Sequence, residues 1–132
     1  MEENNDLISL IREKDTFARH LGMEVIEAAE GHSHVAMPLG EATANAIGIV
    51  HGGAIFGLAD YAFALAANSE GVLSVAIESS IQYMSSCQSE GRLEATAEKV
   101  SETRRLGFYR MKVFKPDGEV IAVCQAIVYK KK

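Results

Sequence analysis

Residues 45–68, NAIGIVHGGAIFGLADYAFALAAN, decide the fold. The segment opens with turn-forming Asn and Gly, passes through His51-Gly52-Gly53, and continues into an apolar run with one carboxylate, Asp60. Its large apolar side chains point to all sides of a helix; they are Ile55, Phe56, Leu58, Tyr61, Phe63 and Leu65. Such a helix is typically buried all round. A membrane span needs about 20 apolar residues without a central charge, so the pattern predicts the central helix of a globular domain.

The start of this helix carries free backbone N–H groups. Gly52 and Gly53 leave the first backbone N–H groups uncovered. These groups have no partner inside a helix and lie at the positive end of its dipole. The helix start can therefore hold an anion or an oxyanion.

Composition limits the alternatives. The chain has 132 residues, so we expect one domain, residues 1–132, with a substantial core. A formal net charge of −5 argues against a general nucleic-acid surface. The N-terminus is acidic and polar, unlike a signal peptide. Cys87 and Cys124 are too few for a disulfide framework and lack metal-site spacing. We expect two reduced cysteines in a cytoplasmic protein.

The chain before the central helix predicts a helix and then strands. Residues 3–20 carry apolar residues at helical spacing, and Gly22 is a usual stop signal. Residues 23–36 are extended, with a turn near Glu30-Gly31. His32 and His34 share one strand face there, so a two-histidine metal site is conceivable. A solvated strand face is favoured, because no Cys or carboxylate partner is near in sequence, and we predict no metal site.

After the central helix, apolar and polar residues alternate with the period of two that is typical of strands. Four alternating segments follow, separated by turn residues: 72–85, 92–101, 106–115 and 119–129. The sequence Lys115-Pro116-Asp117-Gly118 is a strong hairpin signal between two of them. Antiparallel strands must curl to cover a helix that is apolar all round. The sequence therefore predicts an α+β domain.

At this point a family resemblance becomes specific. The pattern Asn45-x5-His51-Gly52-Gly53-x4-Leu58-Ala59-Asp60-x-Ala62, closing with Asn68-Ser69-x-Gly71, resembles the hotdog-fold acyl-CoA thioesterases. It is most similar to their phenylacetate-degradation (PaaI-like) branch, and the similarity covers roughly residues 15–130. The resemblance implies a long central helix wrapped by a curled antiparallel sheet of five to six strands, with an N-terminal helix. It also implies a homodimer assembled into a homotetramer.

The resemblance assigns catalytic roles by position. It implies that the Gly53 N–H polarises the thioester carbonyl, that Asp60 is the general base or nucleophile, and that Asn45 and His51 shape the site. The chemistry agrees, because an N–H aimed at a developing oxyanion can be worth about 3–4 kcal/mol. Water also needs a base unless the carboxylate attacks the carbonyl itself. The sequence does not separate these two routes.

Each assignment has a plainer alternative. Asp60 could be a buried carboxylate satisfied by a neighbour, since charged residues are rarely buried unpaired. His51 could only cap the helix, and Asn45 could only shape the turn. Asn68 is interpreted as the C-terminal cap of the helix.

Further residues are candidates for substrate binding. Where relatives commonly carry Arg-Pro after the strand, this chain has Met84-Ser85-Ser86-Cys87, so the resemblance does not carry over the usual bend and basic contact. Guanidinium groups suit phosphates, which makes Arg104 and Arg105 candidates for the coenzyme A phosphates; solvated turn arginines are the alternative. The remaining candidates are Gly52 at the helix start and Ser79, Ser80 and Tyr83 at the acyl end.

These expectations combine into a thioesterase acting on an aryl- or medium-chain acyl-CoA, without a separate cofactor. The alternatives are a non-catalytic acyl-CoA-binding module and a hydratase, which would need a His together with the carboxylate; no His follows Asp60. Gly53 and Asp60 would lie about 10.5 Å apart along the helix axis, too far to act on one carbonyl. We therefore expect the site to form across a two-fold dimer. No nucleic acid or membrane partner is expected.

Overall fold

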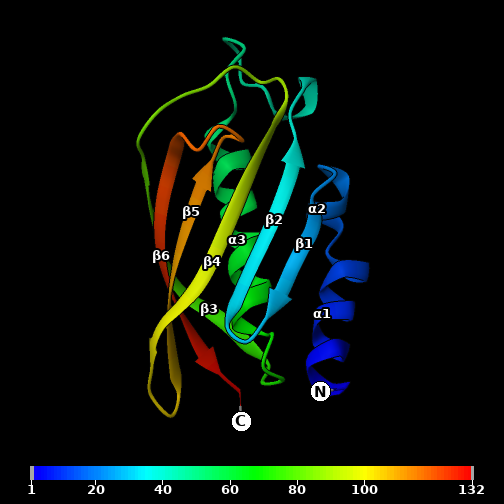
Figure 1. Cartoon of the computed structure of the whole chain (residues 1–132), viewed down its shortest axis with the longest axis vertical. Coiled ribbons are helices and arrows are strands. Elements are labelled where there is room, and N and C mark those ends of the chain that lie inside the picture. The colour runs from blue at the N-terminus through cyan, green and yellow to red at the C-terminus, as the bar shows by residue number, and fades with distance from the viewer. Residues whose placement is uncertain (1, 132) are drawn as a thin grey trace.

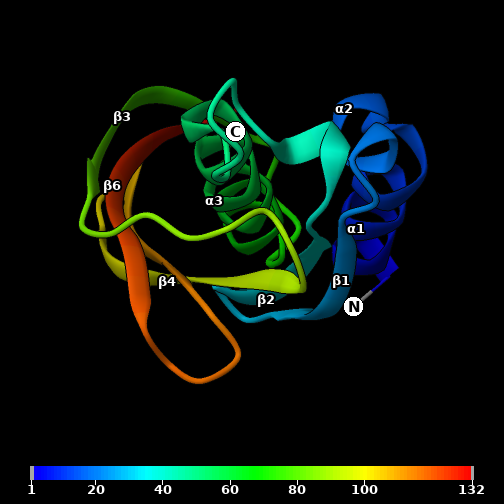
Figure 2. The ribbon, with the colours of Figure 1, turned by 90° about the horizontal axis from the view of Figure 1, so that it is seen from above.

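Helix α3 (Gly52–Ala67) runs through the middle of the fold, and an antiparallel sheet curls round it (Figure 1). The computed structural model describes the backbone of residues 2–131 and the side chains of residues 6–131. Seen from above, the sheet forms an open curve with α3 inside it, and α1 and α2 lie beside β1 (Figure 2). This is the arrangement that the sequence predicts.

The sheet has six strands in the order β1-β2-β4-β5-β6-β3, and every neighbouring pair is antiparallel. In chain order they are β1 (Glu24–Ala29), β2 (His32–Pro38), β3 (Ser74–Tyr83), β4 (Arg92–Glu102), β5 (Leu106–Phe114) and β6 (Val120–Lys130). The four strands predicted after the helix are confirmed. So is the hairpin at Lys115–Gly118, where the Gly118 N–H donates to the Lys115 carbonyl at 2.7 Å and Gly118 has φ +97°.

The N-terminal helix differs from the prediction. One helix over residues 3–20 was expected, but the structure has α1 (Glu2–Lys14) and α2 (Thr16–His20). The break is at Asp15, whose Oδ1 accepts the Ala18 N–H at 3.0 Å. An aspartate in this position is a favoured N-cap. Asp15 therefore ends one helix and starts the next.

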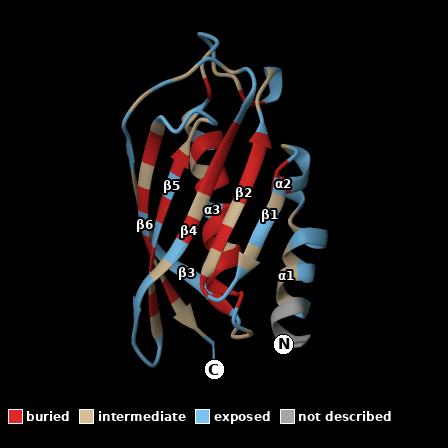
Figure 3. Cartoon of the chain, viewed as in Figure 1, coloured by how far each residue is buried: buried red, intermediate tan, exposed pale blue. Residues whose placement is uncertain are grey.

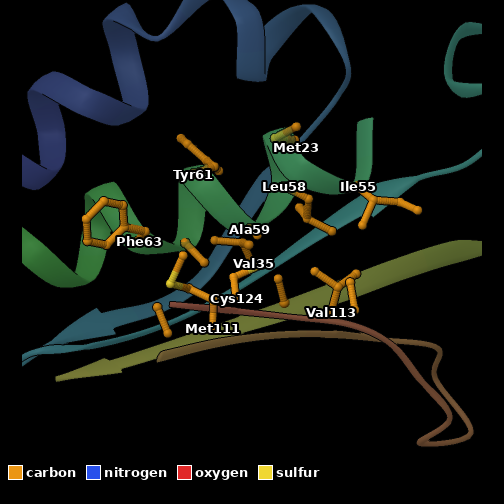
Figure 4. Packing of buried hydrophobic residues seen from close by; sticks show 14 of the residues in the cluster. Met23, Val35, Ile55, Leu58, Ala59, Tyr61, Phe63, Met111, Val113 and Cys124 are labelled. Atoms are coloured by element: carbon orange, nitrogen blue, oxygen red, sulfur yellow. The ribbon is translucent and has the colours of Figure 1, made fainter. Parts of the chain in front are cut away.

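The core lies between α3 and the inner face of the sheet. Figure 4 shows α3 side chains such as Leu58 and Phe63 packed above Met111, Val113 and Cys124 of the strands. Buried residues concentrate on α3 and on the strands facing it (Figure 3). Asn68 is the C-cap of α3, as predicted, and its Nδ2 donates to the Ala64 carbonyl at 2.8 Å.

The sheet does not cover one side of α3, which corrects the prediction of a helix buried all round. The uncovered residues are spaced along one helical face and are exposed or half-buried; they are Gly53, Phe56, Gly57, Asp60 and Ala64. We call them the open stripe. The sheet stops curling at β3, an edge strand that itself exposes Val75 and Ile77. Within residues 2–131, no helix has the length and apolar character needed to cross a membrane.

Candidate active site

His51 caps the start of α3. Its backbone is extended, with φ −64° and ψ 136°, and its Nδ1 accepts the Gly53 N–H at 2.8 Å. In this contact Nδ1 carries no proton, because an imidazole nitrogen accepts only through its lone pair. The Gly53 N–H, which the sequence predicts as the oxyanion donor, thus already has an acceptor.

Gly52 is the first residue of α3 and its N–H remains open. Among the described residues no acceptor is bonded to it. Tyr83, at the end of β3, donates from its hydroxyl to the Gly52 carbonyl at 3.1 Å. A Cβ on Gly52 would lie 3.4 Å from Tyr83 Cζ. The structure therefore brings together Gly52 and Tyr83, two of the predicted substrate-binding residues, beside an unused donor.

Asn45 organises the loop that leads into α3. Its side-chain Oδ1 accepts the N–H groups of Ile47 at 3.1 Å and Ile49 at 3.2 Å. Just before the helix, the His51 N–H donates to the carbonyl of Thr43 at 2.7 Å, in the short 3-10 helix η1 (Glu41–Thr43). The oxygen of Asn45 shapes the turn, as one of the two interpretations predicts.

Asp60 lies on the open stripe, and its carboxylate makes no hydrogen bond or ion pair with any described residue. Desolvation by the surrounding protein raises its pKa, and the negative charge of Asp15 raises it further. Burial, and then the charge of Asp60, raise the pKa of the Cys124 thiol beneath the helix to about 11. No described residue therefore pairs with the Asp60 carboxylate, contrary to the alternative that Asp60 is a buried carboxylate satisfied by a neighbour.

One chain does not bring the helix start and Asp60 to the same point. They are eight residues apart, which is about 12 Å along the axis. An oxyanion donor and a base must each lie within about 3 Å of their targets on one carbonyl and its attacking water. Asp60 lies on the open stripe, whereas the free N–H groups of a helix start project from its end.

The two serines of β3 point in opposite directions. Side chains alternate across a strand. Ser79 is paired with the buried Ala126, and its hydroxyl is buried without a partner among the described residues. Ser80 is exposed and lines a hollow with Arg110 and Gln125 on the outer face of the sheet. The structure therefore does not place Ser80 with α3, because the register of β3 turns it outward.

Arg104 and Arg105 lie in the exposed turn between β4 and β5, at the opposite end of the fold from the start of α3 (Figure 1). Arg105 Nη1 donates to the Tyr129 hydroxyl at 2.6 Å. Within one chain these arginines do not meet the other candidate residues.

The two histidines of β2 have carboxylate neighbours that the sequence order did not reveal. His34 Nε2 lies 2.7 Å from Glu94 Oε1, and Arg92 Nη2 donates to Glu94 Oε2 at 2.8 Å. His32 Nδ1 is 3.9 Å from Glu27 Oε1. No group of three metal ligands gathers within the part of the chain that the structure describes.

Sequence reasoning missed Asp15 and Phe17, which α2 brings to the open stripe. Asp15 is close enough to influence Asp60, and the Phe17 ring packs on Gly57. A signal existed: a glycine inside a helix costs about 1 kcal/mol relative to alanine and usually has a packing reason. Gly57 is such a glycine.

Comparisons with known proteins identify the family of this chain. The thioesterase superfamily matches residues 47–122. A protein of Archaeoglobus fulgidus described as an esterase is 39% identical over 83% of this chain and 71% of its own length. The acyl-coenzyme A thioesterase PaaI of Escherichia coli K12 is 32% identical over 84% of this chain and 79% of its own.

Solved structures give the same result. The structure of E. coli PaaI matches with a TM-score of 0.93 and 27% identity, over 99% of this chain and 95% of that one. A variant of the phenylacetic acid degradation protein PaaI of Thermus thermophilus matches with a TM-score of 0.84 and 33% identity, over 89% of this chain and 100% of that one. The chain therefore belongs to the thioesterase superfamily, as a PaaI-like hotdog thioesterase and thioester hydrolase.

Proposed function

We propose that the protein hydrolyses an aryl- or medium-chain acyl-CoA to the free acid and coenzyme A. The relative from E. coli is named an acyl-coenzyme A thioesterase. The observation that carries the proposal is an unpaired carboxylate, Asp60, on the open stripe of the same helix whose start carries an unused backbone donor, the Gly52 N–H; neither has a partner among the described residues. We propose no separate cofactor, since coenzyme A is part of the substrate.

In this mechanism the Gly52 N–H binds the thioester carbonyl oxygen. Attack on the carbonyl carbon makes that oxygen negative, and a donor fixed at a helix start stabilises it by about 3–4 kcal/mol. The contact between His51 and Gly53 favours Gly52 over Gly53 for this role, because the Gly53 N–H is already used. His51 then acts by fixing the first turn.

Asp60 supplies the base or the nucleophile. As a base it takes a proton from water while the water oxygen attacks the carbonyl carbon; the C–S bond breaks, and the leaving thiolate takes up that proton. As a nucleophile it attacks the carbonyl carbon and forms a mixed anhydride while the C–S bond breaks and coenzyme A leaves as the thiolate; water then hydrolyses the anhydride, which frees the acid and Asp60 and supplies the proton that the thiolate takes up. Both routes need an ionised Asp60, and its raised pKa makes it a stronger base than an ordinary aspartate.

The site would be completed by a second copy. Two antiparallel α3 helices related by a two-fold axis bring the start of one beside the middle of the other, and an isologous dimer does so twice. The same arrangement brings the Arg104-Arg105 turn of one copy toward the helix start of the other, where coenzyme A phosphates could be held. We propose that two such dimers form a tetramer, and that the protein works in the cytoplasm, where its free thiols Cys87 and Cys124 stay reduced.

A screen of CoA thioesters of different acyl groups, with released thiol as the signal, tests this function. We expect turnover by the wild type and almost none by Asp60→Ala. Asp60→Asn should bind the substrate and hydrolyse it slowly. Binding of acyl-CoA without thiol release by the wild type would instead support the non-catalytic module.

A further inference from the structure

We infer that Thr43 and Ser89 are positioning residues for the oxyanion donor. Their hydroxyl groups close a ring of hydrogen bonds with Gly40, and this hydroxyl ring holds the loop before α3 so that the Gly52 N–H points in one direction. The inference rests on the proposed function, in which that N–H binds the thioester carbonyl oxygen. Both hydroxyls act through the backbone and do not contact the substrate themselves.

The hydroxyl ring joins two segments that are far apart in the chain, the 3-10 helix η1 and the loop before β4. The Gly40 N–H donates to Thr43 Oγ1 at 3.0 Å, and Ser89 Oγ donates to the Gly40 carbonyl at 2.7 Å. A hydroxyl carries one proton, so in the 2.8 Å contact between the two hydroxyls Thr43 is the donor and Ser89 the acceptor. The other acceptor within reach of the Thr43 hydroxyl, the Gly40 carbonyl, is more distant at 3.2 Å. Each group of the ring therefore donates to the next, and hydrogen bonds linked in this way strengthen one another.

Burial makes the hydroxyl ring difficult to replace by water. Thr43 is 2% exposed, and Ser89 is half-buried. A buried donor or acceptor that loses its partner keeps the full cost of its desolvation. Removal of either hydroxyl therefore leaves a polar group unpaired, and the loop has to shift to pair it again.

Thr43 also holds the residue that precedes the oxyanion donor. Its carbonyl accepts the His51 N–H at 2.7 Å, and Ala44 and Val50 form an antiparallel bridge beside this contact. The Gly52 N–H belongs to the peptide plane that follows His51, so its direction depends on the backbone angles of His51. A displacement of Thr43 therefore reaches Gly52 through one hydrogen bond and one residue.

The segment that carries Ser89 contacts the same approach to α3 at two further points. The Ser89 N–H donates to the Gly48 carbonyl at 3.3 Å, and the Tyr83 hydroxyl donates to the Gly52 carbonyl at 3.1 Å. These loops meet at the end of the fold where α3 begins (Figure 1). The hydroxyl ring thus fixes the beginning of the approach to α3, and Tyr83 fixes its end.

The position of the Gly52 N–H matters most in the transition state. An oxyanion donor acts at about 2.7–3.1 Å from the oxygen that becomes negative, and a misplacement of about 1 Å can cost roughly 100-fold in rate. The carbonyl oxygen of the bound substrate carries little of this charge, so substrate binding depends less on the donor. The hydroxyl ring should therefore contribute to kcat and little to KM.

Thr43→Val and Ser89→Ala each remove one hydroxyl without adding bulk. We expect each to lower kcat by about tenfold, less than the roughly 100-fold loss for removal of the donor itself, and to change KM by less than about twofold. Because both changes open the same ring, the double variant should be little worse than either single variant. Thr43→Ser keeps the hydroxyl and should keep most of kcat.

Ser69→Ala is the matched control. The Ser69 hydroxyl is also buried, accepts the Gly31 N–H and donates to the Ala66 carbonyl, each at 2.8 Å, but it lies at the far end of α3. This variant should lower the melting temperature about as much as Ser89→Ala does and leave kcat unchanged. An equal loss of kcat in the two variants would overturn the inference, because general destabilisation would then explain both.

A variant without the donor tests whether the hydroxyl ring acts through Gly52. In a Gly52→Pro background, which lacks the N–H, Ser89→Ala should lower kcat no further. A second loss of about tenfold in that background would overturn the inference, because independent effects add.

The NMR signal of the Gly52 amide separates this inference from the proposed function, since it needs no turnover. We expect the signal to shift in Thr43→Val and Ser89→Ala and to stay in place in Ser69→Ala. If the wild type hydrolyses CoA thioesters but the two ring variants keep either the wild-type signal or the wild-type kcat, the inference alone is wrong. If the signal shifts as expected but the wild type releases no thiol, the proposed function is wrong and the hold of the hydroxyl ring on the helix start stands.

Discussion

His51, Gly52 and Gly53 follow one another in the chain, yet their polar groups have different partners. The Gly53 N–H is bonded to His51 Nδ1, whereas the Gly52 N–H has no acceptor among the described residues and the Gly52 carbonyl accepts from Tyr83. The sequence predicted a helix start with open donors. It could not show which donor stays open, because that depends on the side-chain rotamer of His51.

Replacing Gly52 by proline removes the open donor without breaking the helix. Proline is favoured at the first helical position, and the extended ψ of 136° at His51 suits a residue before proline. We expect Gly52→Pro to lower kcat by about 100-fold or more, as the loss of an oxyanion donor does, with little change in melting temperature. Gly52→Ala, whose Cβ would meet Tyr83 at 3.4 Å, keeps the N–H and should keep most activity. Equal activity of the two variants would exclude Gly52 as the donor.

Asp15 should contribute to the position of the acid limb of the pH profile. Its negative charge disfavours ionisation of Asp60 and so contributes, after desolvation, to the raised pKa of that group. Activity should fall as pH drops through this raised pKa, because protonated Asp60 can neither accept a proton nor attack. Asp15→Asn removes the charge but keeps a good N-cap, so the pKa of Asp60 should fall and the acid limb of kcat/KM should move to lower pH.

A charge-matched control for this profile is Asp6→Asn, on the exposed face of α1, which should leave the acid limb in place. The raised pKa of Asp60 also affects the stability of the folded protein. A carboxyl whose pKa is raised by folding destabilises the folded state when it ionises, so Asp60→Asn should raise the melting temperature at pH 7 and lose this gain below about pH 4. A limb that moves to higher pH in Asp15→Asn would contradict the assignment.

Helix α3 and the strands were predictable because their signals are local. The apolar segment, the glycines and the period of two placed α3 and four strands close to their observed bounds. Three features were missed. The helix break at Asp15 is a local cap that the continuous apolar spacing hid, whereas the outward face of Ser80 and the open stripe depend on how the sheet is paired and curled. The stripe was missed because apolar residues surround α3 whether the sheet closes fully or not.

The cap of α3 gives a test of His51. His51→Ala removes the acceptor for the Gly53 N–H and should destabilise the protein by about 1 kcal/mol, with a loss of activity as the first turn frays. Asparagine is among the best N-caps, so His51→Asn should restore both the melting temperature and most of the turnover. If His51→Asn melts like the wild type but is as inactive as His51→Ala, then His51 acts on the substrate directly.

At the scale of the whole molecule, unpaired and apolar groups are exposed beside α3. The open stripe carries the Asp60 carboxylate, which has no partner among the described residues, and the neighbouring edge strand β3 exposes the apolar side chains of Val75 and Ile77. An unprotected edge strand is a ready partner for another strand. A second copy packed against this side would cover both features, which is why we propose that the active unit is a dimer.

Mixing two inactive variants tests the shared site most directly. Asp60→Ala keeps the helix start, and Gly52→Pro keeps the carboxylate; each should be inactive alone. After the two are unfolded and refolded together, random pairing makes half of the dimers mixed, each with one intact site. We therefore expect recovery of about a quarter of wild-type thioesterase activity. No recovery, with mixed dimers demonstrated by mass spectrometry, would contradict a site shared between the helix start of one chain and Asp60 of the other.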